Sequence, residues 1–102
     1  MLEGSVTGVD AAIRWHHYPA AVIRGYVVTR VGADWRLKAT IASRNAYNLA
    51  QRPLVLVVPY KGGACWYWPV HEYTLHEDGA KLSARLGPPL EESVIYGSVR
   101  TA

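Results

Sequence analysis

Apolar and polar residues alternate with a period of two through most of the chain, a pattern that predicts β-strands. The pattern is clearest in HEYTLHEDGAKLSARLG, where Asp78-Gly79 separates two alternating runs. Asp-Gly favours a two-residue type I′ hairpin turn, because both central residues need positive φ. With Glu77 facing Ala80, one face of this hairpin is apolar and the other polar. The predicted cross-strand pairs are Leu75 with Leu82, Tyr73 with Ala84, His71 with Leu86, Glu72 with Arg85, Thr74 with Ser83, and His76 with Lys81.

A second hairpin is predicted in RGYVVTRVGADWRLKATIAS, with its bend at residues 32–34. A four-residue loop over residues 31–34 places Arg30 opposite Trp35 and Val28 opposite Leu37. A three-residue loop would instead place Arg30 opposite Arg36. We favour the first register, because like charges that face each other are unfavourable whereas an arginine over a tryptophan is not.

The segment PLVLVVPYKGGACWYWPV supplies two further strands around the loop at residues 61–63. Residues 54–58 are apolar on both faces, which indicates a central strand that is covered twice. In the partner strand, Trp66, Trp68 and Val70 share one face, and Cys65 and Tyr67 share the other. The apolar phase moves to odd positions after Pro69, so we expect a bulge or a sheet corner at residues 68–71.

The rest of the chain completes an all-β pattern. SRNAYNLAQRP predicts a helix of two turns at most, with Asn45 as its N-cap and Pro53 as its stop. We expect another strand within residues 5–18, a connector at GPPLEE and a closing strand at SVIYGSVRT. About seven short, mainly antiparallel strands at hairpin spacing predict a small all-β barrel or sandwich with one short helical insert, as a single domain over residues 1–102.

Composition agrees with an ordinary globular domain, since 50% of the residues are hydrophobic and 19% are charged. The single cysteine, Cys65, rules out an internal disulfide framework, and the first ten residues lack the pattern of a secretion signal, so a cytoplasmic location is expected. The longest apolar run, residues 54–60, is far shorter than the roughly 20 residues of a membrane-spanning helix. We therefore expect no membrane association.

Reactive or metal-binding side chains do not form a familiar pattern. Cys65, His71 and His76 are spaced C-x5-H-x4-H, which matches no compact zinc motif, and His16 and His17 point apart if the chain there is extended. Nothing near Cys65 marks its thiol as activated, so a structural role is expected. No metal, no cofactor and no enzymatic activity is predicted. YKGGA allows an anion-binding loop, but turn geometry explains its glycines equally well.

Aromatic and arginine residues give the strongest indication of function. The chain has four Trp and seven Tyr but no Phe, and most of these rings are needed to fill the core. The net charge of +3 is mild; the excess of arginine over lysine fits either ligand binding or GC-rich coding. We expect Trp66 and Trp68 to face inward, because two exposed neighbouring Trp side chains would form a large apolar patch. Tyr67 would then lie outside, available to a partner.

These observations favour a non-enzymatic binding module with an aromatic and arginine face, and single-stranded nucleic acid as the first partner to test. The alternative is an oligomerising structural or adaptor protein that buries CWYWPV against a copy of itself or another protein. A small-ligand pocket or an enzyme within the barrel has the least support. The predicted ligand-binding residues are Tyr60, Lys61, Tyr67, Arg30, Arg36, Arg44 and Arg52, and Arg14 and Arg24 belong to the same basic set.

Overall fold

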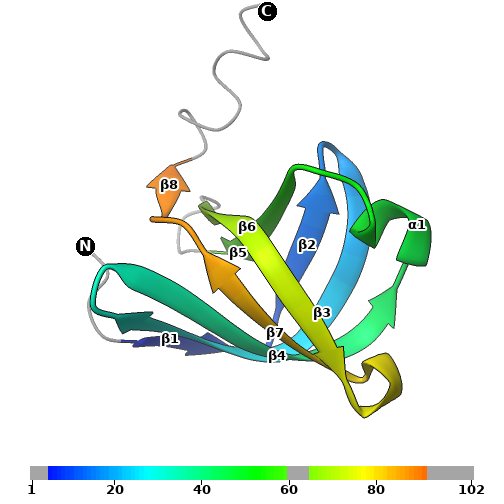
Figure 1. Ribbon diagram of the computed structural model, residues 1–102, viewed down its shortest axis with the longest axis horizontal. Coiled ribbons are helices and arrows are strands. Elements are labelled where there is room, and N and C mark those ends of the chain that lie inside the picture. Colours follow the sequence, from blue (N-terminus) through cyan, green and yellow to red (C-terminus); the bar gives the residue numbers. More distant parts are fainter. Residues whose placement is uncertain (1–4, 60–64, 92–102) are drawn as a thin grey trace, which may run out of the picture.

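The computed structural model describes residues 5–59 and 65–91 and shows an all-β barrel (Figure 1). This confirms the fold class predicted from the alternating pattern. The strands are β1 (Ser5–Gly8), β2 (Ala11–Trp15), β3 (Tyr18–Val31), β4 (Asp34–Arg44), β5 (Leu54–Pro59), β6 (Cys65–His76), β7 (Lys81–Leu86) and β8 (Leu90–Glu91). A helical turn, α1 (Ala46–Leu49), follows β4, and a short 3-10 turn, η2 (Glu77–Gly79), joins β6 to β7.

Six antiparallel strands close the barrel in the order β3-β2-β5-β6-β7-β4, and β4 pairs again with β3. Two long strands make closure possible because each serves different neighbours along its length. β3 pairs with β2 through its first half and with β1 through its second half. β6 pairs with β5 first and with β7 later, while the two-residue β8 lies beside its start. β1 is the extra strand outside the ring.

The core is made by the inward residues of all six barrel strands. Ile13, Val28, Leu56 and Trp68 have no exposed surface, and the ring of Trp68 lies 5.9 Å from that of Trp35, measured between centroids. Trp66 is partly buried and packs against the same cluster. The prediction that Trp66 and Trp68 face the core is therefore confirmed. β5 is a central strand between β2 and β6, as its apolar run indicated.

The β3–β4 hairpin has the preferred register, with Arg30 opposite Trp35 and Val28 opposite Leu37. Its ladder continues one step further than expected, to Val31 and Asp34. The connection therefore shortens to Gly32 and Ala33. Gly32 has φ 64°, a left-handed conformation that glycine adopts without steric cost.

The β6–β7 hairpin has the type I′ turn predicted at Asp78-Gly79, with φ of 56° and 86°. The Ala80 amide donates to the Glu77 carbonyl at 3.0 Å. One detail was wrong: Glu77 also has positive φ, so the ladder stops at His76 and Lys81, and the loop covers residues 77–80.

Five of the six predicted cross-strand pairs in this hairpin are confirmed, and the sixth is not. Val70, rather than His71, lies opposite Leu86, because β6 has a register shift between Val70 and Glu72. This shift is the irregularity that the phase change at residues 68–71 predicted. A bulge inserts one residue, so every pair beyond it moves by one position.

The other predicted elements have mixed outcomes. Residues 5–18 contain β1 and β2, two strands where one was expected, and the connector contains β8. The helix is confirmed as a single turn, with the Asn45 side chain accepting from the Asn48 amide at 3.0 Å. The glycine loop at residues 61–63 and the closing strand SVIYGSVRT lie outside the described residues.

Candidate functional site: an exposed aromatic cluster

A group of exposed rings lies at the end of the barrel where the β2–β3 turn meets α1. Its members are Trp15, His16, Tyr18 and Tyr47, which we call the aromatic cluster. Around Trp15, the ring centroids of His16, Tyr18 and Tyr47 lie at 5.4, 5.6 and 6.3 Å. Tyr18 is 58% exposed and Tyr47 is 69% exposed, whereas Trp15 is half-buried and packs against the core. Trp15 therefore anchors a set of rings whose faces remain open to solvent.

Local sequence explains why these rings converge. Trp15 pairs with Tyr18 across a tight turn in which His16 has φ 57°. Directly paired residues point to the same face of a sheet, so the two rings lie together. Tyr47 comes from α1 and reaches the same place from 29 residues further along the chain than Tyr18.

Two hydrogen bonds to β3 hold α1 in this position. The Asn45 amide donates to the Ala20 carbonyl at 2.8 Å, and the Asn48 side-chain amide donates to the Pro19 carbonyl at 2.8 Å. The Asn45 side chain caps the helix at the same time. Because both asparagines fasten α1 to the start of β3, Tyr47 is presented from a fixed support.

A cleft of about 410 Å³ adjoins the aromatic cluster on the β3–β4 side. Its lining is mainly small and polar: Pro19, Ala21, Val22, Ser43, Arg44, Asn45 and Asn48. Arg44 is exposed there, and its guanidinium extends toward Gly79 in the β6–β7 turn. One of the predicted arginines therefore lines the cleft that adjoins the exposed rings, while its guanidinium reaches toward the β6–β7 turn.

Arg52, by contrast, has a structural position. Its guanidinium donates to the carbonyls of Leu49 and Gln51, at 3.3 and 2.8 Å, and lies 5.6 Å from the ring centroid of Tyr73. The Tyr73 hydroxyl donates to the same Leu49 carbonyl at 3.0 Å. Arg52 thus holds the end of α1 against the barrel.

Arg30 and Arg36 lie near the opposite end of the barrel, in the β3–β4 hairpin. Arg30 donates from Nε to the Gly32 carbonyl at 3.1 Å, and Arg36 is 3.7 Å from the Asp34 carboxylate. Arg30 is paired with the inward-facing Trp35, so it lies on the other face of the hairpin from Arg36. At about 3.3 Å a residue, Arg36 and Arg44 are about 26 Å apart along β4. The predicted arginines therefore do not form one face.

The predicted tyrosine contact is not on the surface. Tyr67 is only 3% exposed, so the expectation that it is open to a partner was wrong. It lies opposite the buried Val57 on one side and Leu90 of β8 on the other. Two strand neighbours, rather than solvent, flank its backbone. Tyr60 and Lys61 lie outside the described residues.

The described part of the chain has little sign of reactive chemistry. Within residues 5–59 and 65–91, no group of three or more His, Cys, Asp or Glu side chains is placed to hold a metal ion. Cys65 is a free, partly buried thiol. In the same residues no helix is long and apolar enough to cross a membrane.

Comparison with known proteins gives this chain no relative: no family model, no curated protein and no solved structure matches it. A barrel of this kind serves many unrelated functions, so the fold alone implies none. The functional argument therefore rests on the side chains of the site.

The aromatic cluster was missed in the sequence, although two signals mark it. RWHHYP packs four ring side chains into six positions around a tight turn. Charge is also segregated, because no Asp or Glu occurs at residues 11–33 or 35–71, the ranges that supply the cluster and its cleft. The ring-rich stretch CWYWPV is more conspicuous in the sequence, but its Trp66 and Trp68 pack in the core.

Proposed function

We propose that this protein is a non-enzymatic module that binds single-stranded nucleic acid by stacking bases on the aromatic cluster. The observation that carries this proposal is the open ring surface of Tyr18 and Tyr47, 58% and 69% exposed, beside Trp15. Unstacked bases present planar faces of any sequence to such rings. A domain that needed these side chains only for its core would bury them.

Charge around the cluster supports an anionic ligand. Arg14 and Arg44 lie on the strands that lead to the cluster, and His16 and His17 form its turn. No Asp or Glu occurs at residues 11–33 or 35–71, so the chain segments that supply the cluster and its cleft carry no carboxylate of their own, although the Arg44 guanidinium reaches toward the turn that contains Glu77 and Asp78. Basic side chains next to stacking rings are the two parts that single-strand binding needs. A cytoplasmic location, which the single cysteine favours, belongs to the same proposal.

Fluorescence anisotropy of a labelled oligothymidine of about twelve nucleotides tests the proposal, because a small barrel covers about 4–16 nucleotides. Removing one stacking ring costs about 1–3 kcal/mol, so Tyr47→Ala and Tyr18→Ala should each weaken binding by about 5- to 150-fold. Tyr47→Phe is the matched control, because it keeps the ring. Binding that is unchanged in both alanine variants, or absent in the parent protein, would overturn the proposal.

The alternative, an oligomerising structural or adaptor protein, depended on the surface of CWYWPV. Tyr67, Trp68 and Val70 are at most 5% exposed, so this stretch offers a partner little area. Light scattering over a range of protein concentrations separates the two hypotheses. A mass that rises with concentration, together with no effect of the tyrosine variants on oligonucleotide binding, would favour the alternative.

A further inference from the structure

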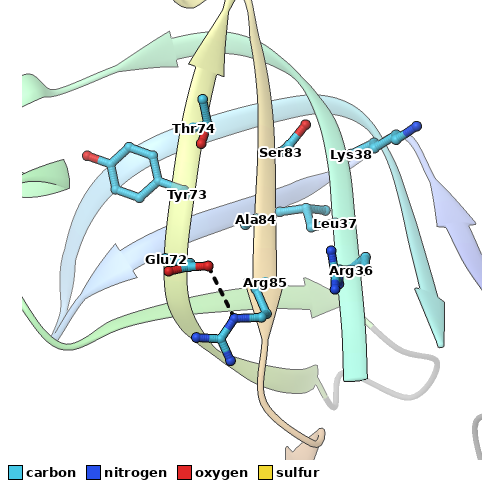
Figure 2. A pocket seen from close by; sticks show the side chains of 9 residues that line it. All are labelled: Arg36, Leu37, Lys38, Glu72, Tyr73, Thr74, Ser83, Ala84 and Arg85. Carbon is cyan, nitrogen blue, oxygen red and sulfur yellow. Dashed lines mark hydrogen bonds and ion pairs between the residues drawn. The ribbon is translucent and has the colours of Figure 1, made fainter. Parts of the chain in front are cut away.

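A second surface, on the outer face of the barrel, carries four lysine and arginine side chains that the aromatic cluster does not use. It consists of two adjoining clefts of about 540 and 430 Å³, which share Lys38 and Ser83 in their linings. Figure 2 shows the larger cleft, with side chains of β4, β6 and β7 around it. Its cationic residues are Arg36, Lys38 and Arg85, and Lys81 lines the smaller cleft.

Strand register brings these cations onto one face. Arg36 lies directly opposite Arg85 across β4 and β7, Lys38 opposite Ser83, and Thr40 opposite Lys81. Two arginines that face each other in a sheet repel and destabilise it. If this surface served folding alone, the protein would be more stable with the two arginines apart. An anion bound between them would instead be attracted by both charges.

Carboxylates hold three of these four cations, but only weakly. The ion pairs are Arg85 with Glu72 at 3.3 Å, Arg36 with Asp34 at 3.7 Å, and Lys81 with Glu77 at 3.8 Å, and each of these side chains is at least 42% exposed. Exposed pairs of this kind contribute little, because water and salt screen them. Phosphate can therefore replace a carboxylate here at small cost. Lys38 makes no ion pair within the described residues.

The outer face of β4 connects this surface to the aromatic cluster. From Arg36, it passes Lys38 and Thr40 and reaches Ser43, which lines the cleft beside the cluster. Seven residues of strand span about 23 Å. Three clefts thus follow one strand from the basic face to the exposed rings.

We propose that this basic face, Arg36, Lys38, Lys81 and Arg85, is a phosphate track, which holds the backbone of the same nucleic acid strand whose bases stack on the aromatic cluster. The inference rests on the proposed function. It adds a ligand path along β4, a minimum ligand length and a set of residues that contribute affinity without reading sequence. A nucleic acid strand long enough to contact both surfaces binds more tightly than one that contacts the aromatic cluster alone.

Oligothymidines of two lengths, about four and about twelve nucleotides, test the track by fluorescence anisotropy at several salt concentrations. For single strands, log K falls with log salt at a slope of about 0.7 per neutralised phosphate, so each lost contact weakens binding about fivefold at 0.1 M salt. Lys38→Gln and Arg36→Gln should each show this loss, and a shallower slope, with the longer ligand. Arg30→Gln is the matched control, because Arg30 lies on the other face of the same hairpin.

Two further variants separate a phosphate contact from a structural role. Lys38→Arg keeps the charge and should restore binding. Glu72→Gln removes the carboxylate that holds Arg85 and should tighten binding of the longer ligand, with the binding of the shorter one unchanged. Thermal melts should match the parent protein, because these side chains are exposed.

The outcomes distinguish the track from the stacking site. If Tyr47→Ala weakens binding while the lysine and arginine variants change neither affinity nor salt slope, the track is wrong and the proposed function stands. If Lys38→Gln and Arg30→Gln weaken binding equally, the effect is one of net charge and the track is again wrong. If the track variants weaken binding of heparin as strongly as that of the oligonucleotide and the tyrosine variants have no effect, both proposals fail.

Discussion

Trp68→Ala is the substitution that most directly tests where the core of this barrel lies. Trp68 has no exposed surface, sits opposite Leu56 in the β5–β6 ladder and packs against Trp35. A buried aromatic side chain removes about 150–250 Å² from water, which at about 25 cal/mol per Å² stabilises the fold by about 4–6 kcal/mol. Most of this is lost in alanine.

One feature of Trp68 reduces this loss. Its Nε1–H is buried and has no hydrogen-bond partner among the described residues, which costs the native state about 1–3 kcal/mol. Alanine removes that cost but leaves a cavity, which adds to the destabilisation. The expected net loss is about 3–5 kcal/mol, the usual range for truncating a buried Trp. A domain of this size has about 5–15 kcal/mol of stability in total, so the effect is large.

Urea unfolding followed by far-UV circular dichroism measures the loss without depending on tryptophan fluorescence. Tyr47→Ala is the control, because a 69% exposed side chain should change the free energy of unfolding by no more than about 0.5 kcal/mol. Trp68→Phe keeps most of the apolar area and removes the unpaired N–H, so it should cost less than about 1.5 kcal/mol. Equal losses in Trp68→Ala and Tyr47→Ala would refute the assignment of Trp68 to the core and of Tyr47 to the surface.

Two other predictions concern single positions. Gly79→Val should destabilise the protein by about 1–2 kcal/mol more than Gly25→Val. Gly79 has φ 86° and its added side chain would meet Arg44, whereas nothing lies within 4 Å of a Cβ at Gly25. Similar urea midpoints for the two variants would contradict the turn geometry. Burial, assisted by the charge of Asp10, raises the pKa of the Tyr26 hydroxyl above 10.0. The stability that this hydroxyl contributes is therefore complete below pH 10.0 and is lost as the pH rises through the pKa of the folded state. Melting temperatures measured across this range should fall more steeply for the parent protein than for Tyr26→Phe, and parallel curves would show that Tyr26 does not titrate as described.

Local pattern was sufficient to predict the strands of residues 26–44, 54–58 and 66–86, the two hairpins at Gly32 and Asp78-Gly79, and the bulge. Asp78-Gly79 has its own turn chemistry, and cross-strand complementarity then sets each neighbouring pair, so these features depend on residues close in sequence. The predicted pairing of His71 with Leu86 was wrong because the bulge inserts a single residue, which moves the pairing to Val70. A phase change shows that a bulge is present but leaves its position uncertain by a residue or more.

The candidate site was not predictable in the same way. Alternation correctly placed Trp68 and Tyr67 on opposite faces of β6, and the inward face was chosen correctly. Period-two alternation says that two residues differ in face, but it does not say whether the outer face meets solvent. In the folded barrel Tyr67 is enclosed although it points away from the core, so its ring is not open to a partner.

Closure of the barrel decided which side chains meet at the candidate site. Trp15 and Tyr47 are 32 residues apart in sequence, and they meet because β3 and β4 return the chain to the β2–β3 turn and two asparagines fasten α1 there. The same long strands carry Arg36 and Arg44 to opposite ends of the molecule. The sequence by itself determined which residues pair and which turns form, because those depend on short-range sterics and side-chain alternation. Only the tertiary structure decided which rings are open and which charges adjoin them, because these follow from the curvature and order of strands distant in the chain.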